Sequence, residues 1–351
     1  MPIKIHPLDI LKGSGFPSVG VDGLDGRHQA LRDELTASHG RKTGTPWRQI
    51  RYKQVLFNRT RTSCPRFASK GKKTTYSAVT WFPLLVCAGC LAGCGLINAT
   101  ISQQAKDFGF QREILQGKPF QHVAFFNGSP CADGQWHVYL DGDGKAWLTP
   151  HRAASDPTPK KSFLLDLMKS DPAPSMYLGR PCYHGLAHSP LCNPWVWTQQ
   201  RYSQTVVESL AQALQRRLPD KQCRIVLIGY SGGGALAMLM AAKLPQAQGI
   251  VTLAGNLDVG AWTRLHGFSP LTGSLDPARQ PALPEAIYQI HVTGTEDKQI
   301  PPNLIIQAIH KYPHAELIKI KNLNHQGNWS TIWPEVLQKI RSHLKKREVN
   351  Q

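Results

Sequence analysis

One stretch, residues 224–238, constrains the fold more than any other part of the 351-residue chain. Residues 225–228 read Ile-Val-Leu-Ile, an apolar run typical of a strand that is buried on both faces. Gly-Tyr-Ser-Gly-Gly follows at 229–233, and a strongly helix-forming run occupies 235–242. The stretch therefore predicts a strand, a sharp turn and a helix, with Ser231 at the tip of the turn.

The residues around Ser231 match the G-x-S-x-G pattern of a nucleophile elbow. Such a turn strains the backbone at the serine, and its flanking positions need glycine because a Cβ there would collide with the crossing strand and helix. The free N–H groups at the start of the helix favour negative charge beside the serine. Glycine-rich strand-to-helix turns also occur as plain structural crossings, but the buried strand and the helix on either side favour a reactive serine.

The first quarter of the chain differs in composition from the rest. The formal net charge is +18, and more than half of it falls within residues 1–93. Residues 1–69 are rich in Gly, Arg, Ser and Thr without apolar periodicity, which predicts a disordered extension. Alternatively, translation starts near residue 70 and residues 1–69 do not belong to the protein.

Residues 70–93 have the features of a secretory signal peptide. A basic run, Lys-Gly-Lys-Lys at 70–73, precedes an apolar segment at 78–90 and small residues at 92–93. Pro83 and Gly89 interrupt the apolar segment, which is also short for a membrane span of about 20 residues.

Leu-Ala-Gly-Cys at 91–94 resembles a bacterial lipobox, in which the cysteine receives diacylglycerol and becomes the new N-terminus. The resemblance implies lipidation of Cys94 and a membrane anchor, followed by a tether at 94–103. Gly95 stands where an inner-membrane retention signal would have Asp, which favours the periplasmic side of the outer membrane. The alternative interpretation is a buried, cysteine-rich helix.

Beyond the tether, strands alternate with helices through residues 104–351, which predicts an α/β domain with a mostly parallel sheet covered on both faces. Expected strands lie at 121–126, 136–140, 175–178, 225–228, 249–255, 286–292 and 316–320, and expected helices at 105–110, 161–169, 202–218, 235–242, 302–312 and 329–347. Residues 256–284 contain Gly, Pro and Trp with little periodicity, which favours a lid-like insertion over a site.

Two polar segments follow later strands. Gly-Thr-Glu-Asp at 294–297 comes directly after one strand, and Asn-His at 324–325 follows the last strand. The carboxyl ends of parallel strands face the same crevice, so Ser231, Asp297 and His325 are expected to converge. Each also has an ordinary alternative: Asp297 could cap a helix, Glu296 could be the acid, and His325 could be an exposed loop histidine.

From about residue 104 to 345 the chain resembles the bacterial serine α/β-hydrolases of the esterase and lipase type. The resemblance is carried by Gly229-Tyr230-Ser231-Gly232-Gly233, Gly294-Thr295-Glu296-Asp297 and Asn324-His325. Three further segments, at 138–147, 156–159 and 177–182, look like a little-characterised lipoprotein-type group. Asp141-Gly142-Asp143 stands where the commoner lipases often have His-Gly-x.

The resemblance implies a Ser–His–Asp triad. Ser231 would attack an acyl carbonyl, His325 would accept and return the proton, and Asp297 would orient the imidazole. The backbone N–H groups of Gly232 and Asp143 would form the oxyanion hole. The expected activity is cleavage of carboxylic esters or related acyl compounds, and the expected substrate is a small or lipid-like acyl compound. The expected enzyme uses no cofactor.

Other functions are weighed against this one. An acyltransferase or thioesterase would use the same fold with a different acceptor or leaving group, and a peptidase would be expected to have a separate gating domain. A non-catalytic surface lipoprotein would not need the three residues in order.

Asp-Gly-Asp-Gly at 141–144 offers too few oxygen ligands for calcium, so no metal is expected. The lysines follow no aromatic-interleaved basic motif, so nucleic acid is not expected as a partner.

The cysteines after Cys94 allow a prediction of which thiols form a disulfide bond. Cys182 and Cys192 bracket a short loop in an exported protein and are expected to form a disulfide. Cys131 and Cys223 are expected to be separate buried thiols.

Overall fold

A computed structural model describes residues 100–132, 134–218 and 222–349. The helices among them are α2 (Ile101–Asp107), α3 (Phe163–Lys169), α4 (Pro194–Trp197), α5 (Gln204–Arg217), α6 (Gly232–Ala241), α7 (Val259–Leu265), α8 (Pro302–Ile309) and α9 (Trp333–Val349), with 3₁₀ turns η1 (Pro277–Arg279) and η2 (Trp329–Thr331). The strands are β1 (Gln111–Gln116), β2 (Gln121–Asn127), β3 (Gln135–Leu140), β4 (Trp147–Thr149), β5 (Arg152–Ala153), β6 (Ser175–Leu178), β7 (Arg224–Tyr230), β8 (Ala247–Leu253), β9 (Tyr288–Gly294) and β10 (Glu316–Ile320).

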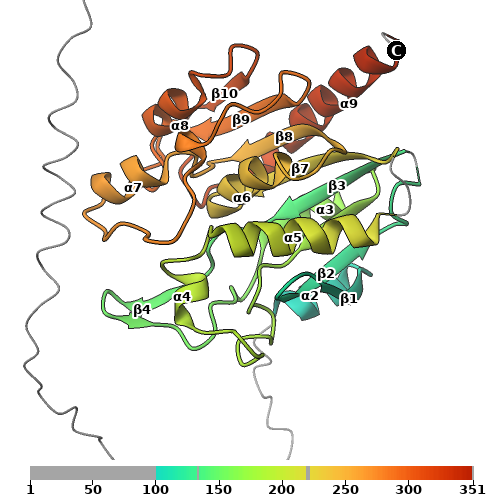
Figure 1. Cartoon of the computed structure of the whole chain (residues 1–351). Helices are drawn as coiled ribbons and strands as arrows, with labels where there is room; N and C mark the ends of the chain where they lie inside the picture. The colour runs from blue at the N-terminus through green and yellow to red at the C-terminus, as the bar shows by residue number, and fades with distance from the viewer. Residues whose placement is uncertain (1–99, 133, 219–221, 350–351) are drawn as a thin grey trace, which may run out of the picture. The chain divides into compact units, whose positions relative to one another are not determined.

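Eight of these strands form one twisted sheet in the order β1-β2-β6-β3-β7-β8-β9-β10 (Figure 1). β2 runs antiparallel to both of its neighbours, and the pairs from β6 to β10 are all parallel. β4 and β5 form a separate small antiparallel pair. The carboxyl ends of β7, β9 and β10 consequently open at the same edge of the sheet.

Helices cover both faces of the sheet. One buried cluster joins the sheet to apolar residues of α5, α6 and α8, and a second joins it to apolar residues of α2, α3 and α9. Side chains of β7 alternate between the two clusters, with Ile225 and Leu227 in the first and Val226 and Ile228 in the second. This two-sided burial explains why the strand is apolar without interruption.

The sequence locates most of these elements, and the structure adds some that the sequence does not indicate. β6 and β10 have the expected bounds, and the other expected strands and helices shift by a few residues at their ends. β1 was not expected, because as an edge strand it buries only Leu115. α2 begins at Ile101, inside the expected tether, because Ile101 is buried against the core and Thr100 caps the helix.

The structure contains the expected disulfide and corrects the other cysteine prediction. Cys182 and Cys192 are joined, as the sequence predicts. Cys131 and Cys223 are also joined, so the expectation of two separate thiols is wrong. The physical reason is the pairing of β3 with β7, in which Gln135 lies opposite Arg224. This register brings the turn after β2 to the residue just before β7, although the two cysteines are 92 positions apart.

The extension at 1–69, the signal peptide at 70–93, Cys94 and the first part of the tether lie outside the described residues. Among the helices that the structure does describe, none has the length and apolar character needed to cross a bilayer.

Candidate active site

Ser231 occupies a strained turn between β7 and α6. Its φ of 51° and ψ of −118° fall in a region that non-glycine residues seldom adopt. The turn is held by the N–H of Ser231, which donates to the carbonyl of Leu253 at 2.9 Å. A Cβ on Gly229 would overlap the backbone of Gly233, and one on Gly233 would overlap the carbonyl of Leu140. The two glycines of the motif are therefore required by close backbone packing.

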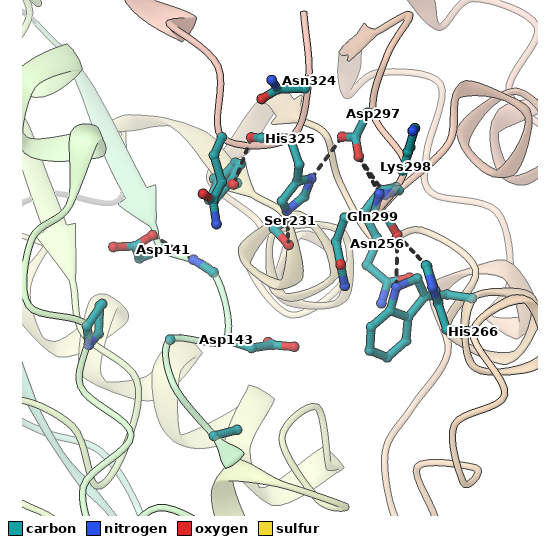
Figure 2. A pocket seen from close by; sticks show the side chains of 18 of the residues that line it. Asp141, Asp143, Ser231, Asn256, His266, Asp297, Lys298, Gln299, Asn324 and His325 are labelled. Atoms are coloured by element: carbon teal, nitrogen blue, oxygen red, sulfur yellow. Dashed lines mark hydrogen bonds and ion pairs between the residues drawn. The ribbon is translucent and has the colours of Figure 1, made fainter. Parts of the chain in front are cut away.

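The three predicted residues meet at the carboxyl edge of the sheet (Figure 2). His325 Nε2 lies 3.1 Å from Ser231 Oγ, and His325 Nδ1 lies 2.8 Å from Asp297 Oδ2. Because the carboxylate can only accept, Nδ1 carries the proton and Nε2 is left to accept from the serine hydroxyl. Glu296, the alternative acid, has an exposed side chain, and the imidazole faces Asp297 instead.

Asp297 is fixed by its own loop. The residue is 3% exposed, and its Oδ1 accepts from the N–H groups of Gln299 and Ile300 at 2.9 and 2.7 Å. One carboxylate oxygen thus caps the loop and the other faces His325, whereas α8 begins after Pro301 without a side-chain cap, so Asp297 does not cap that helix.

The loop that carries His325 is held by two aromatic side chains. The carbonyl of His325 accepts from Tyr230 Oη at 2.9 Å and from Trp329 Nε1 at 3.0 Å. The ring of Tyr230 also lies 5.0 Å from that of His325. The sequence indicates neither aromatic residue as part of the site. Both donate to a backbone carbonyl, which has no sequence signature, and Tyr230 lies 95 positions away from the residue it contacts.

The loop after β3 passes next to the serine. A Cβ on Gly142 would lie 3.5 Å from Cβ of Ser231, so the loop backbone approaches it closely. Within the described part of the chain, no backbone carbonyl accepts from the N–H of Asp143 or from that of Gly232. The two N–H groups predicted to hold an oxyanion are therefore not engaged by the backbone.

The two acids of this loop differ in their surroundings. Burial raises the pKa of the Asp141 carboxyl, and its hydrogen bonds, one of them from Tyr177, only partly oppose this effect. Burial, the largest single effect, would also raise the pKa of Asp143, but the charges of Arg201 and Arg180 together with the hydrogen bonds from Arg201 and Tyr202 hold it below its usual range. No group of three or more His, Cys, Asp and Glu side chains among the described residues is arranged to hold a metal ion.

A cleft of about 1790 Å³ opens over Ser231 and His325. Its apolar lining includes Trp147, Phe163, Trp262, Leu265, Phe268 and Ile300, and its charged lining includes Lys145, Lys161, Arg201 and Lys298. Five residues of the cleft lining belong to the expected lid-like insertion at 256–284, namely Asn256, Trp262, Leu265, His266 and Phe268. This insertion is not irregular throughout, because it contains α7 and η1.

α7 is joined to the loop of Asp297. Trp262 Nε1 donates to the carbonyl of Gln299 at 3.1 Å, and His266 Nε2 lies 2.8 Å from the same oxygen. The insertion therefore forms one wall of the cleft, and its action as a lid stays a prediction.

Three residues that contact the site region are not indicated by any sequence motif for a catalytic group. Arg180, Arg201 and Tyr202 converge on the carboxylate of Asp143 from two loops distant in sequence. A buried arginine in a polar segment has the same sequence signature as an exposed one, so the sequence alone does not predict these contacts.

No family model matches the sequence, and neither does any curated protein. Solved structures do match. An α/β serine hydrolase from Xanthomonas campestris, described as lacking a lid, is 11% identical, with 68% of this chain and 94% of that chain covered and a TM-score of 0.43. An esterase from Pyrococcus furiosus is 13% identical, with 69% and 93% covered and a TM-score of 0.45. A bacterial membrane phospholipase A is 14% identical, with 72% and 91% covered and a TM-score of 0.45.

The fold follows from the sheet and from the place of the three residues on it. Ser231 comes directly after β7, Asp297 follows β9 and His325 follows β10, in the chain order Ser, acid, His. The mostly parallel eight-stranded sheet has helices on both faces, and by this topology the described part of the chain has the α/β-hydrolase fold.

Proposed function

We propose that this protein is a serine hydrolase that cleaves carboxylic esters or related acyl compounds through an acyl-enzyme. The observation that carries the proposal is the position of His325, whose two ring nitrogens face Asp297 at 2.8 Å and Ser231 at 3.1 Å. A nucleophile, a base and a group that orients the base, in contact in this order, are the minimal machinery of acyl transfer.

In the proposed reaction Ser231 Oγ forms a bond to the acyl carbon while its proton passes to His325 Nε2. The carbonyl oxygen becomes an oxyanion, which the N–H groups of Gly232 and Asp143 would hold, each contributing on the order of 10²–10³ in rate. Collapse of the intermediate breaks the bond to the alcohol, which takes the proton from His325. Water, deprotonated by the same imidazole, then releases the acid and restores Ser231.

The cleft supports an acyl substrate with an apolar part. Trp147, Leu265 and Phe268 expose apolar surface in the cleft that contains Ser231, and Lys145, Lys161 and Lys298 lie among the other lining residues. We assign the apolar wall to the acyl chain or to an apolar alcohol.

Labelling with a fluorophosphonate tests the proposal, because this probe reacts with an activated serine and needs no knowledge of the substrate. The purified full-length protein is expected to be labelled, and Ser231→Ala and His325→Ala are expected to lose the label. Ser330→Ala, a change at an exposed serine near the site, is the control and is expected to label like the parent. A folded parent protein that takes up no label would contradict the proposal.

We further propose that the protein is exported and anchored through lipid on Cys94, on the periplasmic side of the outer membrane. The support is the sequence alone: a basic run, an apolar segment and Leu-Ala-Gly-Cys occur in the order of a lipoprotein signal. The two disulfides among the described residues fit an oxidising compartment.

Cys94→Ala is expected to move the protein from the detergent phase to the aqueous phase in a phase-partition assay of expressing cells, because the acyl chains would be missing. Cys90→Ala, which changes another cysteine of the same stretch, is expected to partition like the parent. Equal partition of the Cys94 variant and the parent would show that the anchor lies elsewhere.

A further inference from the structure

The carboxylate of Asp143 is the centre of a hydrogen-bonded ion network beside the serine. Arg180 Nη2 donates to Oδ1 at 2.8 Å, and Arg201 Nη1 donates to Oδ2 at 2.7 Å. Tyr202 Oη lies 2.8 Å from both oxygens. Three donor groups, with the Tyr202 hydroxyl placed between the two oxygens, thus fix the side chain of a single residue in the loop after β3.

The side chains of the network are largely buried, and together they carry excess positive charge. The side chains of Arg180 and Arg201 are 4% and 6% exposed, and that of Asp143 is 19% exposed. Two guanidinium groups face one carboxylate, whose pKa is held low by them, so the three ionised side chains sum to one positive charge. Charged groups in such a place are costly unless they are paired and hydrogen-bonded, which these are.

The same residues also fix the backbone of the loop. Arg180 Nε donates to the carbonyl of Asp141 at 3.3 Å, and Tyr183 Oη donates to the carbonyl of Asp143 at 2.8 Å. These carbonyls belong to the peptides on either side of the Gly142–Asp143 peptide. With both flanking peptides held, the orientation of the peptide that carries the Asp143 N–H is determined.

The network also touches the first turn of α6. A Cβ on Gly232 would overlap Oδ1 of Asp143 and would lie 2.5 Å from Tyr202 Oη. The carboxylate and the phenol therefore pack directly against the residue that carries the second oxyanion N–H. One cluster sets the spacing of the two donors.

We propose that Arg180, Arg201 and Tyr202 are positioning residues for the oxyanion hole, acting through the carboxylate of Asp143. This inference rests on the proposed function and deepens it. The network keeps the Asp143 and Gly232 N–H groups at a fixed separation, and its two guanidinium charges more than offset the negative charge that an ionised Asp143 places near the developing oxyanion.

The test compares Arg201→Met, Arg201→Lys and Tyr202→Phe with the full-length parent, using a soluble short-chain nitrophenyl ester, the second-order rate of fluorophosphonate labelling, and the melting temperature. Arg201→Met is expected to lower kcat about 10- to 100-fold with KM within about threefold of the parent, less than loss of a whole oxyanion donor. Arg201→Lys is expected to recover part of kcat, since it restores the charge without the planar fork. Tyr202→Phe keeps the ring and is expected to lower kcat less than Arg201→Met does.

Arg217→Met, which removes an arginine paired with Glu113 away from the cleft, is the matched control and is expected to leave kcat unchanged. Unchanged kcat in folded Arg201→Met and Tyr202→Phe, with only the melting temperature lowered, would overturn the inference. So would a rise in KM at constant kcat, which would make Arg201 a substrate-binding residue. An unlabelled parent would instead refute the proposed function, and the inference with it.

Discussion

Asp297→Asn is expected to lower kcat by about four orders of magnitude while leaving the fold intact. Asparagine can keep Oδ1 as acceptor for the N–H groups of Gln299 and Ile300, so the loop retains its local bonds. Its amide nitrogen would then face His325 Nδ1, where the carboxylate now accepts. This favours the tautomer with the proton on Nε2, which cannot accept the proton of Ser231.

The measurement is kcat on a soluble ester together with the rate of fluorophosphonate labelling. Glu296→Gln is the control, because Glu296 is the neighbouring acid and has no hydrogen bond to His325 among the described contacts. Its kcat is expected to stay close to that of the parent. If Glu296→Gln were the more damaging change, the assignment of the acid would be wrong.

Removal of the Cys131–Cys223 bridge is expected to have the largest effect on stability. The bridge spans 92 positions, and the chain-entropy estimate for a loop of this length is about 4–5 kcal/mol in the free energy of unfolding. The double variant Cys131→Ser, Cys223→Ser is expected to lose stability of this order. Urea denaturation of the oxidised parent and the variant measures the difference.

The Cys182–Cys192 bridge provides the internal comparison. It spans ten positions, and the same estimate gives about 3 kcal/mol, so the corresponding double serine variant is expected to be the less destabilised of the two. Reaction of native, unreduced protein with a thiol reagent at Cys131 or Cys223 would show that the longer bridge is absent.

The elements that the sequence predicts well are those whose burial follows a regular pattern along the chain. β7 is apolar on both faces, and the stripe of α5 repeats at helical spacing, so local patterns suffice. β1 escapes prediction because five of its six side chains are not buried, and α7 escapes because it is one short helix within an irregular stretch. Their formation depends on pairing with β2 and on contacts with the loop of Asp297.

The residues of the candidate site also fall into those that the sequence predicts and those that it does not. The convergence of Ser231, Asp297 and His325 could be predicted because each follows a recognisable strand, and the order of strands in such a sheet brings their ends together. The partner of Cys131 and the arginines on Asp143 could not be found, because those contacts join segments separated by tens of residues. Sequence spacing contains no information on such distances.

The hydrogen bond from Tyr230 to the carbonyl of His325 joins the loop after β10 to the residue that immediately precedes Ser231. Trp329 holds the same carbonyl and is itself fully buried, which ties the last loop to the packing beneath α9. The loop of His325 is therefore held on two sides, by the residue before Ser231 and by the apolar cluster that contains α9. Any displacement of the main chain of this loop would have to break contacts with both.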